Sequence, residues 1–324
     1  MSRLALLGYI FRVDSSEKDL IVVTGAAGFI GGALSNLLSK NYRVRGIDNL
    51  STGDWSRCND SIERIEADIS QSNHESLEGL FEGSKYIFHL AAVKLHNHSN
   101  NWDSINRSNI EGTRRVFEAA SAANVRKVIF TSSLYAYGSM GLKTMNEEDP
   151  LKPFNFYGLS KAYGEKALTI HGNNTGLDFA IARLFFIYGP HQFAHGGYKS
   201  VIMKNIENAL CGRPLEINGD GNQSLDYVYI SDCVQILSDL AESSFSGTIN
   251  VSSGQATKVN EIISILSEIS GVEKISHQKR DWTHDTCRFG SPKLREELLG
   301  IRQLTTMREG LENTWEWAKN GISR

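Results

Sequence analysis

The sequence predicts an α/β fold built on a doubly wound parallel sheet, followed by a smaller C-terminal α/β lobe. Through the first 190 residues, strand-like apolar runs alternate with stretches of helical apolar spacing. Because parallel strands need crossover connections, this alternation indicates right-handed βαβ units. The apolar runs are continuous, as expected for strands that are buried on both faces. Beyond residue 190 the pattern loosens into short helices and loops.

Six apolar runs are expected to form the sheet. They cover residues 20–25, 43–48, 62–70, 85–92, 127–133 and 178–189, and helical spacing marks residues 31–40, 108–123 and 157–172. We expect a sheet-forming domain and a second lobe, with the chain crossing between them more than once. The first comprises residues 19–185 and about 226–253, and the second comprises residues 186–225 and 254–324. Residues 1–18 would form an N-terminal extension to which the sequence assigns no role.

Length and composition exclude several classes of protein. The chain has 324 residues, with 34 Lys and Arg against 37 Asp and Glu and a formal charge of −3. Basic residues occur only in pairs, so no nucleic-acid partner is expected. No run approaches the roughly 18 apolar residues of a membrane span, so no membrane partner is expected either. The four cysteines are scattered, which favours free thiols and a cytoplasmic location.

A glycine-rich turn, TGAAGFIG at residues 24–31, follows the first expected strand. In a strand–turn–helix unit, Gly25 allows the tight turn, Gly28 lets the backbone approach a pyrophosphate, and Gly31 permits close helix–strand packing. Free N–H groups at the start of the helix attract phosphates. An ordinary tight turn also accounts for three glycines. However, Asp48 follows 20 residues after Gly28, where a carboxylate can hold ribose hydroxyls, so the pattern predicts a Rossmann-type dinucleotide site.

The residues around the ends of the second and third strands favour NAD over NADP. Asn49 and Leu50 follow Asp48, and no arginine stands there to pair with a 2′-phosphate, which Asp48 would repel. Asp68 and Ile69 follow the third strand and can contact adenine. A surface aspartate at a strand end is an equally simple interpretation of Asp68.

Tyr157 and Lys161 form a YxxxK pair on one face of an expected helix. A tyrosine with a pKa of about 10 is a poor base at neutral pH. A lysine ammonium one turn away, with a nicotinamide cation nearby, would lower that pKa. Ser133, at the end of the fifth strand, can hydrogen-bond the same reacting hydroxyl. The alternative is an ordinary helix with an exposed Tyr and Lys.

These motifs, taken in order, resemble the extended short-chain dehydrogenase/reductase superfamily and, within it, the nucleotide-sugar epimerases and dehydratases. The series TGAAGFIG, IDNLSTG, HLAAVK, NIEGT, SSLYAYG, YGLSK, RLFFIYGP and GDGNQSLDYVYISD occurs in family order. HLAAVK and IDNLSTG look most like the UDP-galactose 4-epimerases. The resemblance implies a catalytic trio of Ser133, Tyr157 and Lys161, with NAD as cofactor. The expected NAD contacts are Gly25, Gly28, Phe29, Ile30, Gly31, Asp48, Asn49, Asp68, Ile69, Leu90, Ala91, Ala92, Lys94, Asn109, Tyr157 and Lys161.

Departures from related branches narrow the implied chemistry. The sugar 4,6-dehydratases carry an Asp-Glu pair just after the catalytic Ser or Thr, and this sequence has Leu134 and Tyr135 there. The UDP-glucuronate decarboxylases place a Glu where Tyr135 stands. The fucose-synthase-type enzymes use a Cys beside the catalytic Ser, and none of the four cysteines is there. The branch that remains needs only a Tyr/Ser/Lys centre and a nicotinamide, which is 4-epimerisation by transient oxidation.

Two departures concern the substrate. The family's Asn in RxFNxYGP, which contacts the sugar nucleotide, is Phe186 here, and the pyrophosphate-binding Arg of QxRDF is Leu225. Arg280 keeps another expected cation, and Lys199 or His195 can compensate for the lost one, unless their loop is simply solvated. Either the diphosphate binds differently, or the substrate is not an ordinary nucleotide diphosphosugar. The expected substrate contacts are Lys94, Ser133, Tyr135, Phe186, Lys199 and Arg280.

We therefore expect NAD-dependent epimerisation of a nucleotide-diphospho-sugar, with a UDP-sugar as substrate, at C4 through a transient 4-keto intermediate. The alternatives are a dehydrogenase or reductase that acts once, a dehydratase or decarboxylase, and a non-catalytic NAD-binding scaffold. The resemblance implies a homodimer formed by the helix after Gly112 and the YGLSK helix. No metal site is expected, because His96 and His98 lack partners at ligand spacing.

Overall fold

The structure, a computed structural model, describes residues 18–94, 102–138, 143–192, 199–279 and 286–322. Its main sheet has seven parallel strands. They are β1 (Leu20–Thr24), β2 (Arg43–Asp48), β3 (Glu63–Glu66), β4 (Ser84–His89), β5 (Lys127–Ser133), β6 (Asp178–Leu184) and β11 (Gly247–Val251). Their order is β11-β6-β5-β4-β1-β2-β3, which reverses direction at β1 and is the doubly wound arrangement. The predicted fold class is confirmed.

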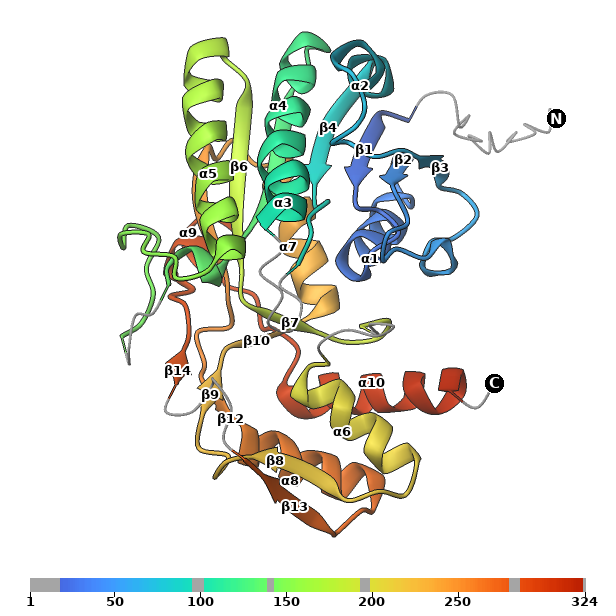
Figure 1. Cartoon of the computed structure of the whole chain (residues 1–324), viewed down its shortest axis with the longest axis vertical. Coiled ribbons are helices and arrows are strands. Elements are labelled where there is room, and N and C mark those ends of the chain that lie inside the picture. The colour runs from blue at the N-terminus through green and yellow to red at the C-terminus, as the bar shows by residue number, and fades with distance from the viewer. Residues whose placement is uncertain (1–17, 95–101, 139–142, 193–198, 280–285, 323–324) are drawn as a thin grey trace, which may run out of the picture.

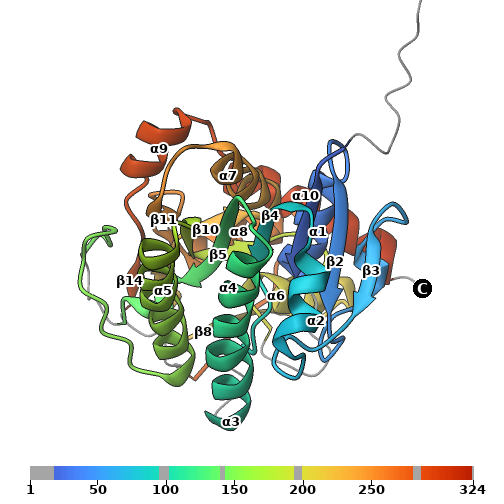
Figure 2. The same cartoon turned by 90° about the horizontal axis from the view of Figure 1, so that it is seen from above.

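Helices cover both faces of this sheet. They are α1 (Phe29–Leu38), α2 (His74–Phe81), α3 (Trp102–Ile105), α4 (Thr113–Ala122), α5 (Phe156–Thr175) and α7 (Ile230–Glu242), with the short helices η2 (Trp55–Arg57) and η4 (Leu134–Ala136). Seen from above, α4 and α5 lie on one side of the strands and α7 on the other (Figure 2). Side chains of β1 serve both layers: Val22 packs with the α4 layer, while Ile21 and Val23 pack with the α7 layer. This double burial explains the continuous apolar runs.

The remaining elements form a smaller lobe that faces the carboxyl ends of the sheet strands (Figure 1). Its helices are α6 (Val201–Leu210), α8 (Val259–Ser270) and α10 (Met307–Ile322), while α9 (Lys293–Leu299) packs against β11 of the main sheet and against α7. Its strands are β7 (Phe186–Tyr188), β8 (Leu215–Asn218), β9 (Ser224–Leu225), β10 (Tyr227–Tyr229), β12 (Thr257–Lys258), β13 (Ile275–Gln278) and β14 (Cys287–Arg288). They pair as β10-β7, β12-β9-β14 and β13-β8.

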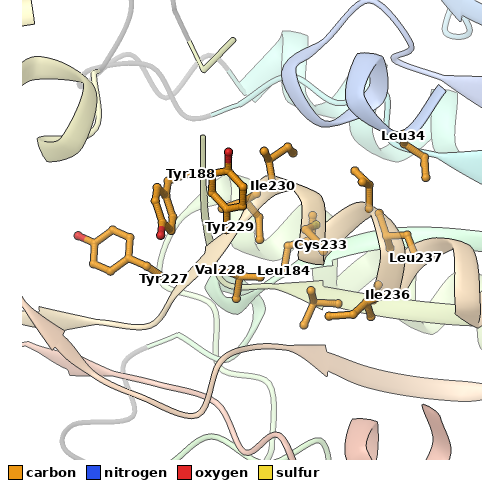
Figure 3. Packing of buried hydrophobic residues seen from close by; sticks show 14 of the residues in the cluster. Leu34, Leu184, Tyr188, Tyr227, Val228, Tyr229, Ile230, Cys233, Ile236 and Leu237 are labelled. Carbon is orange, nitrogen blue, oxygen red and sulfur yellow. The ribbon is translucent and has the colours of Figure 1, made fainter. Parts of the chain in front are cut away.

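One apolar cluster runs from the main sheet into the smaller lobe. Figure 3 shows Cys233, Ile236 and Leu237 of α7 in this cluster, together with tyrosines of β7 and β10. The ring centroids of Tyr188 and Tyr229 lie 5.5 Å apart. Ile202 of α6 belongs to the same cluster, so the two parts share a continuous core. Among the described helices, none combines the length and the apolar character required to cross a membrane.

The prediction of a single strand over residues 178–189 is wrong, because the structure has two strands there, β6 and β7. The backbone N–H of Phe185 donates to Val251 O over 3.2 Å, and that of Phe186 donates to Asp226 O over 3.0 Å. The chain therefore changes partner from β11 to the β9–β10 segment at this point. This change carries the segment from the sheet into the smaller lobe.

The expected helix 108–123 is also divided. Its first part belongs to the π-helical segment η3 (Asn106–Gly112), and the regular helix α4 begins only at Thr113. Wider π turns are frequent at functional sites, because they move a side chain away from its regular position. Here the segment carries Asn109, whose contacts are described below.

Candidate active site

The glycine turn between β1 and α1 leaves space that a side chain would fill. Gly25 has φ +73°, and a Cβ there would lie 2.7 Å from Ala91 N; a Cβ at Gly31 would lie 2.0 Å from Gly25 O. Helix α1 begins at Phe29 and Ile30, directly after Gly28, so its first N–H groups point into the turn. These features fit the diphosphate of a dinucleotide, which needs backbone donors and no intervening side chains.

Asp48 is fixed at the carboxyl end of β2. Its Oδ2 accepts a hydrogen bond from Ala27 N over 3.0 Å, and its Oδ1 accepts one from Leu50 N over 2.8 Å. Burial raises the pKa of Asp48, and the two backbone hydrogen bonds and the charge of Arg57 oppose that effect. The carboxylate is thereby held beside the glycine turn, where the sequence places a ribose.

Asn49 and Asp68 meet at the ends of β2 and β3. Asn49 Nδ2 donates to Asp68 Oδ2 over 3.3 Å. Burial raises the pKa of Asp68, but hydrogen bonds from Ser70 outweigh it, so the pKa lies below its usual value. Ile69 is buried in the apolar cluster beneath this edge. The pair lies on the same edge of the sheet as Asp48.

The segment after β4 lies across the glycine turn. Leu90 N donates to Thr24 O over 3.1 Å, and Ala91 N donates to Thr24 Oγ1 over 3.4 Å. Ala92 follows, and the segment then reaches the exposed Lys94. The NAD contacts expected from the segment after β4 therefore lie next to those expected from the glycine turn after β1.

Asn109 makes its hydrogen bonds within the protein. Its Oδ1 accepts from Val93 N over 2.7 Å, while its Nδ2 donates to Val93 O over 2.9 Å and to Ser160 Oγ over 3.1 Å. Both amide N–H donors are thus used within the protein, and the side chain is buried. These contacts hold the segment that ends at Lys94 against η3 and α5.

Ser133, Tyr157 and Lys161 come together at the carboxyl end of β5. Ser133 is the last residue of β5, and Tyr157 and Lys161 lie in the first two turns of α5. Asn155 caps the N-terminus of helix α5, because its Oδ1 accepts a hydrogen bond from Gly158 N over 2.7 Å. Lys161 Nζ donates to Thr131 O over 2.8 Å and lies 5.9 Å from the Tyr157 ring centroid. The two elements are therefore held in fixed relation.

The electrostatics of the trio differ from the expected lowering of the tyrosine pKa. Burial raises the pKa of Tyr157 to about 12, against a hydrogen bond with Ser133 that lowers it. Burial lowers the pKa of Lys161 to about 7, helped by the charge of Lys94 and opposed by Glu165. The polypeptide alone therefore disfavours both the phenolate and the ammonium.

The substrate side of the site is aromatic. The Tyr135 ring centroid lies 6.0 Å from that of Tyr157, in an edge-to-face arrangement. Leu134 belongs to a buried apolar cluster, and its side chain has no group that could transfer a proton. Phe186 lies 5.9 Å from the Tyr227 ring, at the start of β7. The rings of Tyr135 and Phe186 stand where the decarboxylase branch has a Glu and the family pattern has an Asn.

Of the cations expected in the loops, only Lys199 lies within the described residues. Lys199 pairs with Glu207 of α6, with 2.5 Å between Nζ and Oε2, so a carboxylate already balances its charge. Arg280, His195, His96 and His98 lie outside the described residues, as does the N-terminal extension up to residue 17.

Two arginines at the site were missed by sequence reasoning. Arg57 of η2 donates from Nη1 to Ala27 O over 2.8 Å, which places a cation against the glycine turn. Arg288 of β14 lies 5.9 Å from the Tyr135 ring centroid. No spacing rule marks Arg57. One feature of the sequence points to Arg288, which follows Arg280 in the same segment. In the structure its strand pairs with β9, where Leu225 occupies the position of the family's arginine.

Comparison with known proteins agrees with this architecture. Residues 21–252 match the NAD dependent epimerase/dehydratase family. The UDP-glucose 4-epimerase of Mycolicibacterium smegmatis is 33% identical over 312 residues, which cover 92% of this chain and 98% of that protein. The structure of the UDP-glucose 4-epimerase of Thermotoga maritima with UDP-glucose has a TM-score of 0.85 at 29% identity, and covers 94% of this chain and 99% of that chain.

A further solved relative extends the range of bound sugars. The UDP-N-acetylglucosamine 4-epimerase of Methanobrevibacter ruminantium M1, in complex with UDP-N-acetylmuramic acid, has a TM-score of 0.86 at 29% identity, and covers 93% of this chain and 97% of that chain. The fold and site thus define a dinucleotide-dependent enzyme of the extended short-chain dehydrogenase/reductase type. The chain belongs to the NAD dependent epimerase/dehydratase family, with NAD as its cofactor.

Proposed function

We propose that the protein interconverts the C4 epimers of a UDP-sugar through a transient 4-keto intermediate. The observation that carries this proposal is the approach of Ser133, Tyr157 and Lys161 at a site where Leu134 is buried and Tyr135 faces the base. No carboxylate stands at these two positions to move protons at C5 and C6. The 4-epimerases among its relatives share the fold over nearly the whole chain.

The cofactor would be held by the glycine turn at Gly25, Gly28 and Gly31, by the start of α1, and by Asp48. When bound there, NAD would supply reversible hydride transfer for oxidation and reduction at the sugar C4. Asp48 holds its ribose in this proposal and, by repulsion, disfavours a 2′-phosphate.

Tyr157 acts as the base that takes the proton of the C4 hydroxyl and later returns it. Because the polypeptide alone gives Tyr157 a pKa of about 12, proton loss at neutral pH requires additional positive charge beside the phenol. Bound NAD would supply such charge through its cationic nicotinamide ring, Lys161 adds to it in its protonated form, and Ser133 steadies the reacting hydroxyl. The smaller lobe, which we propose to consist of residues 186–229 and most of 254–324, would cover the sugar and exclude water while the 4-keto sugar turns.

The test is incubation of the purified protein with UDP-glucose, UDP-N-acetylglucosamine and UDP-glucuronate, followed by chromatographic separation of epimers. We expect one substrate to give its C4 epimer with no net change in NAD. Net formation of NADH would instead show a dehydrogenase, and loss of 18 mass units, the mass of water, would show a dehydratase. NAD released on denaturation would support a retained cofactor, which a self-regenerating cycle requires.

We also propose a homodimer formed through α5. Phe156, Leu159, Tyr163 and Ile170 are 36–50% exposed and follow one stripe of this helix. Trp102 of α3 continues the stripe, with its ring 4.7 Å from that of Phe156. Light scattering should give twice the 36.0 kDa chain mass for the native protein and a monomer for Ile170→Glu. Leu298→Glu, which changes an exposed apolar residue on α9, is the control.

We further propose a cytoplasmic location. The four cysteines, Cys58, Cys211, Cys233 and Cys287, are free thiols in the structure. Free thiols persist in a reducing compartment. Fractionation of the source cells with an antibody against the protein tests this location.

A further inference from the structure

Strand β14 lies beside β9 in a register that brings Arg288 opposite Leu225. Residues paired on neighbouring strands project to the same face of the sheet, because side chains alternate with a period of two. The side chain of Arg288 therefore extends from the face to which an arginine at position 225 would point. The family pattern has its arginine at that position, and this chain has leucine.

The surroundings of Arg288 hold its guanidinium at the substrate side of the site. The guanidinium carbon lies 5.9 Å from the Tyr135 ring centroid and 5.6 Å from that of Phe154. Tyr135 in turn packs against Tyr157. One aromatic ring thus separates Arg288 from the proposed base. Aromatic contacts on a planar guanidinium leave its N–H edge directed in a fixed fork, the geometry that binds oxyanions bidentately.

Arg288 is buried. Only 6% of Arg288 is exposed, and burial lowers its pKa, with Tyr135 acting in the opposite direction. Removing a cation from water is unfavourable, so a bound anionic oxygen would stabilise the charged form. Asp226, next to Leu225, uses its carboxylate to accept hydrogen bonds from Ser253 and from the backbone N–H groups of Gly254 and Gly290.

We propose that Arg288 binds an anionic oxygen of the substrate and supplies the positive charge that Leu225 lacks. This inference rests on the proposed function, since it assumes a nucleotide-sugar ligand. The anionic oxygen belongs either to the diphosphate or to a carboxylate on the sugar. Relocation of the cation from β9 to β14 would retain the charge of the site while changing the direction from which it approaches the ligand.

The experiment measures ligand binding by isothermal titration calorimetry on the NAD-loaded protein, independently of turnover. The ligands are UDP, uridine, UDP-glucose and UDP-glucuronate. The variants are Arg288→Leu, Arg288→Lys and the double variant Leu225→Arg/Arg288→Leu. Arg308→Leu on α10, which removes an exposed arginine paired with Glu268, is the control. Thermal unfolding and NAD content are recorded for each variant, and Arg288→Lys keeps the charge and most of the volume where Arg288→Leu fails to fold.

If the diphosphate is the partner, Arg288→Leu weakens UDP binding about 10- to 100-fold and leaves uridine binding unchanged, as expected for loss of charged hydrogen bonds. If a sugar carboxylate is the partner, only UDP-glucuronate binding weakens. In both cases Arg288→Lys gives a smaller loss, and an arginine at position 225 restores part of the affinity. The inference would be overturned if each of the four ligands bound a folded Arg288 variant with the same affinity as it binds the native protein. Arginine-dependent UDP binding without epimerisation of any sugar would instead overturn the proposed function alone.

Discussion

Glu165 and Arg183 form a bidentate ion pair that is buried between α5 and β6. Arg183 Nε donates to Glu165 Oε1 over 2.9 Å, and Arg183 Nη2 donates to Oε2 over 2.7 Å. Ser132 Oγ also donates to Glu165. Since Glu165 lies one turn after Lys161 and Ser132 precedes Ser133, this cluster connects the two elements that carry the catalytic trio.

Glu165→Gln should lower the free energy of unfolding by about 3–5 kcal/mol, because it leaves the charge of Arg183 buried without its carboxylate. It should also lower kcat more than it raises KM, since the trio moves while the ligand contacts remain. Urea denaturation and steady-state kinetics measure the two effects. Glu118→Gln, which alters a more exposed ion pair with Arg114, should cost less than about 1 kcal/mol. Equal losses in the two variants would contradict a positioning role.

The substitution Asn109→Leu distinguishes two roles of Asn109, which are the positioning of residues 90–94 and direct contact with NAD. The substitution leaves the N–H and C=O of Val93 without their side-chain partner, at a cost of about 1–3 kcal/mol for each group that stays buried. The segment ending at Lys94 should then loosen, which hydrogen exchange at residues 90–94 would detect as faster exchange. Asn173→Leu, on the exposed face of α5, is the control. Loss of NAD content with unchanged exchange would instead indicate that Asn109 contacts the cofactor directly.

Tyr157→Phe should reduce turnover by at least about 100-fold, the lower range for loss of a general base. NAD content should stay nearly unchanged, because the phenol contributes its reactivity more than its packing. The control is Tyr163→Phe, which changes an exposed tyrosine further along the same helix and should keep full activity. Native turnover in the Tyr157 variant would remove the assignment of the base.

The sequence predicts the sheet, the glycine turn and the Tyr157–Lys161 pair because their signals are local. A strand–turn–helix unit and an i, i+4 spacing are complete within a few residues. The division of the expected strand 178–189 has no such signal. Residues 184–188 are all apolar, and the change of partner at Phe185 depends on Val251 and Asp226, which lie far along the chain.

The parts of the site that escaped prediction depend on tertiary contacts. Arg288 reaches the site because β14 pairs with β9 in one particular register, which the sequence does not specify. The pKa of Tyr157 rises because packed protein surrounds the phenol, whereas the sequence shows only the lysine one turn away. Asn109 uses both of its amide donors within the protein because η3 and α5 approach the segment after β4.

His89 makes the stability of the fold depend on pH. It is completely buried, with Nδ1 2.7 Å from Thr24 Oγ1 and Nε2 2.9 Å from Thr113 Oγ1, and burial lowers its pKa from 6.5 to about 3. Between these values the unfolded chain binds a proton that the folded chain does not, so stability is full above pH 6.5 and falls as pH decreases towards 3. The slope from this residue approaches about 1.4 kcal/mol per pH unit. In urea denaturation at pH 7.5, 6 and 4.5, His89→Gln should lack this component, while His74→Gln, an exposed change on α2, should keep it. Parallel pH dependence of the native protein and His89→Gln would show that this residue does not titrate on unfolding.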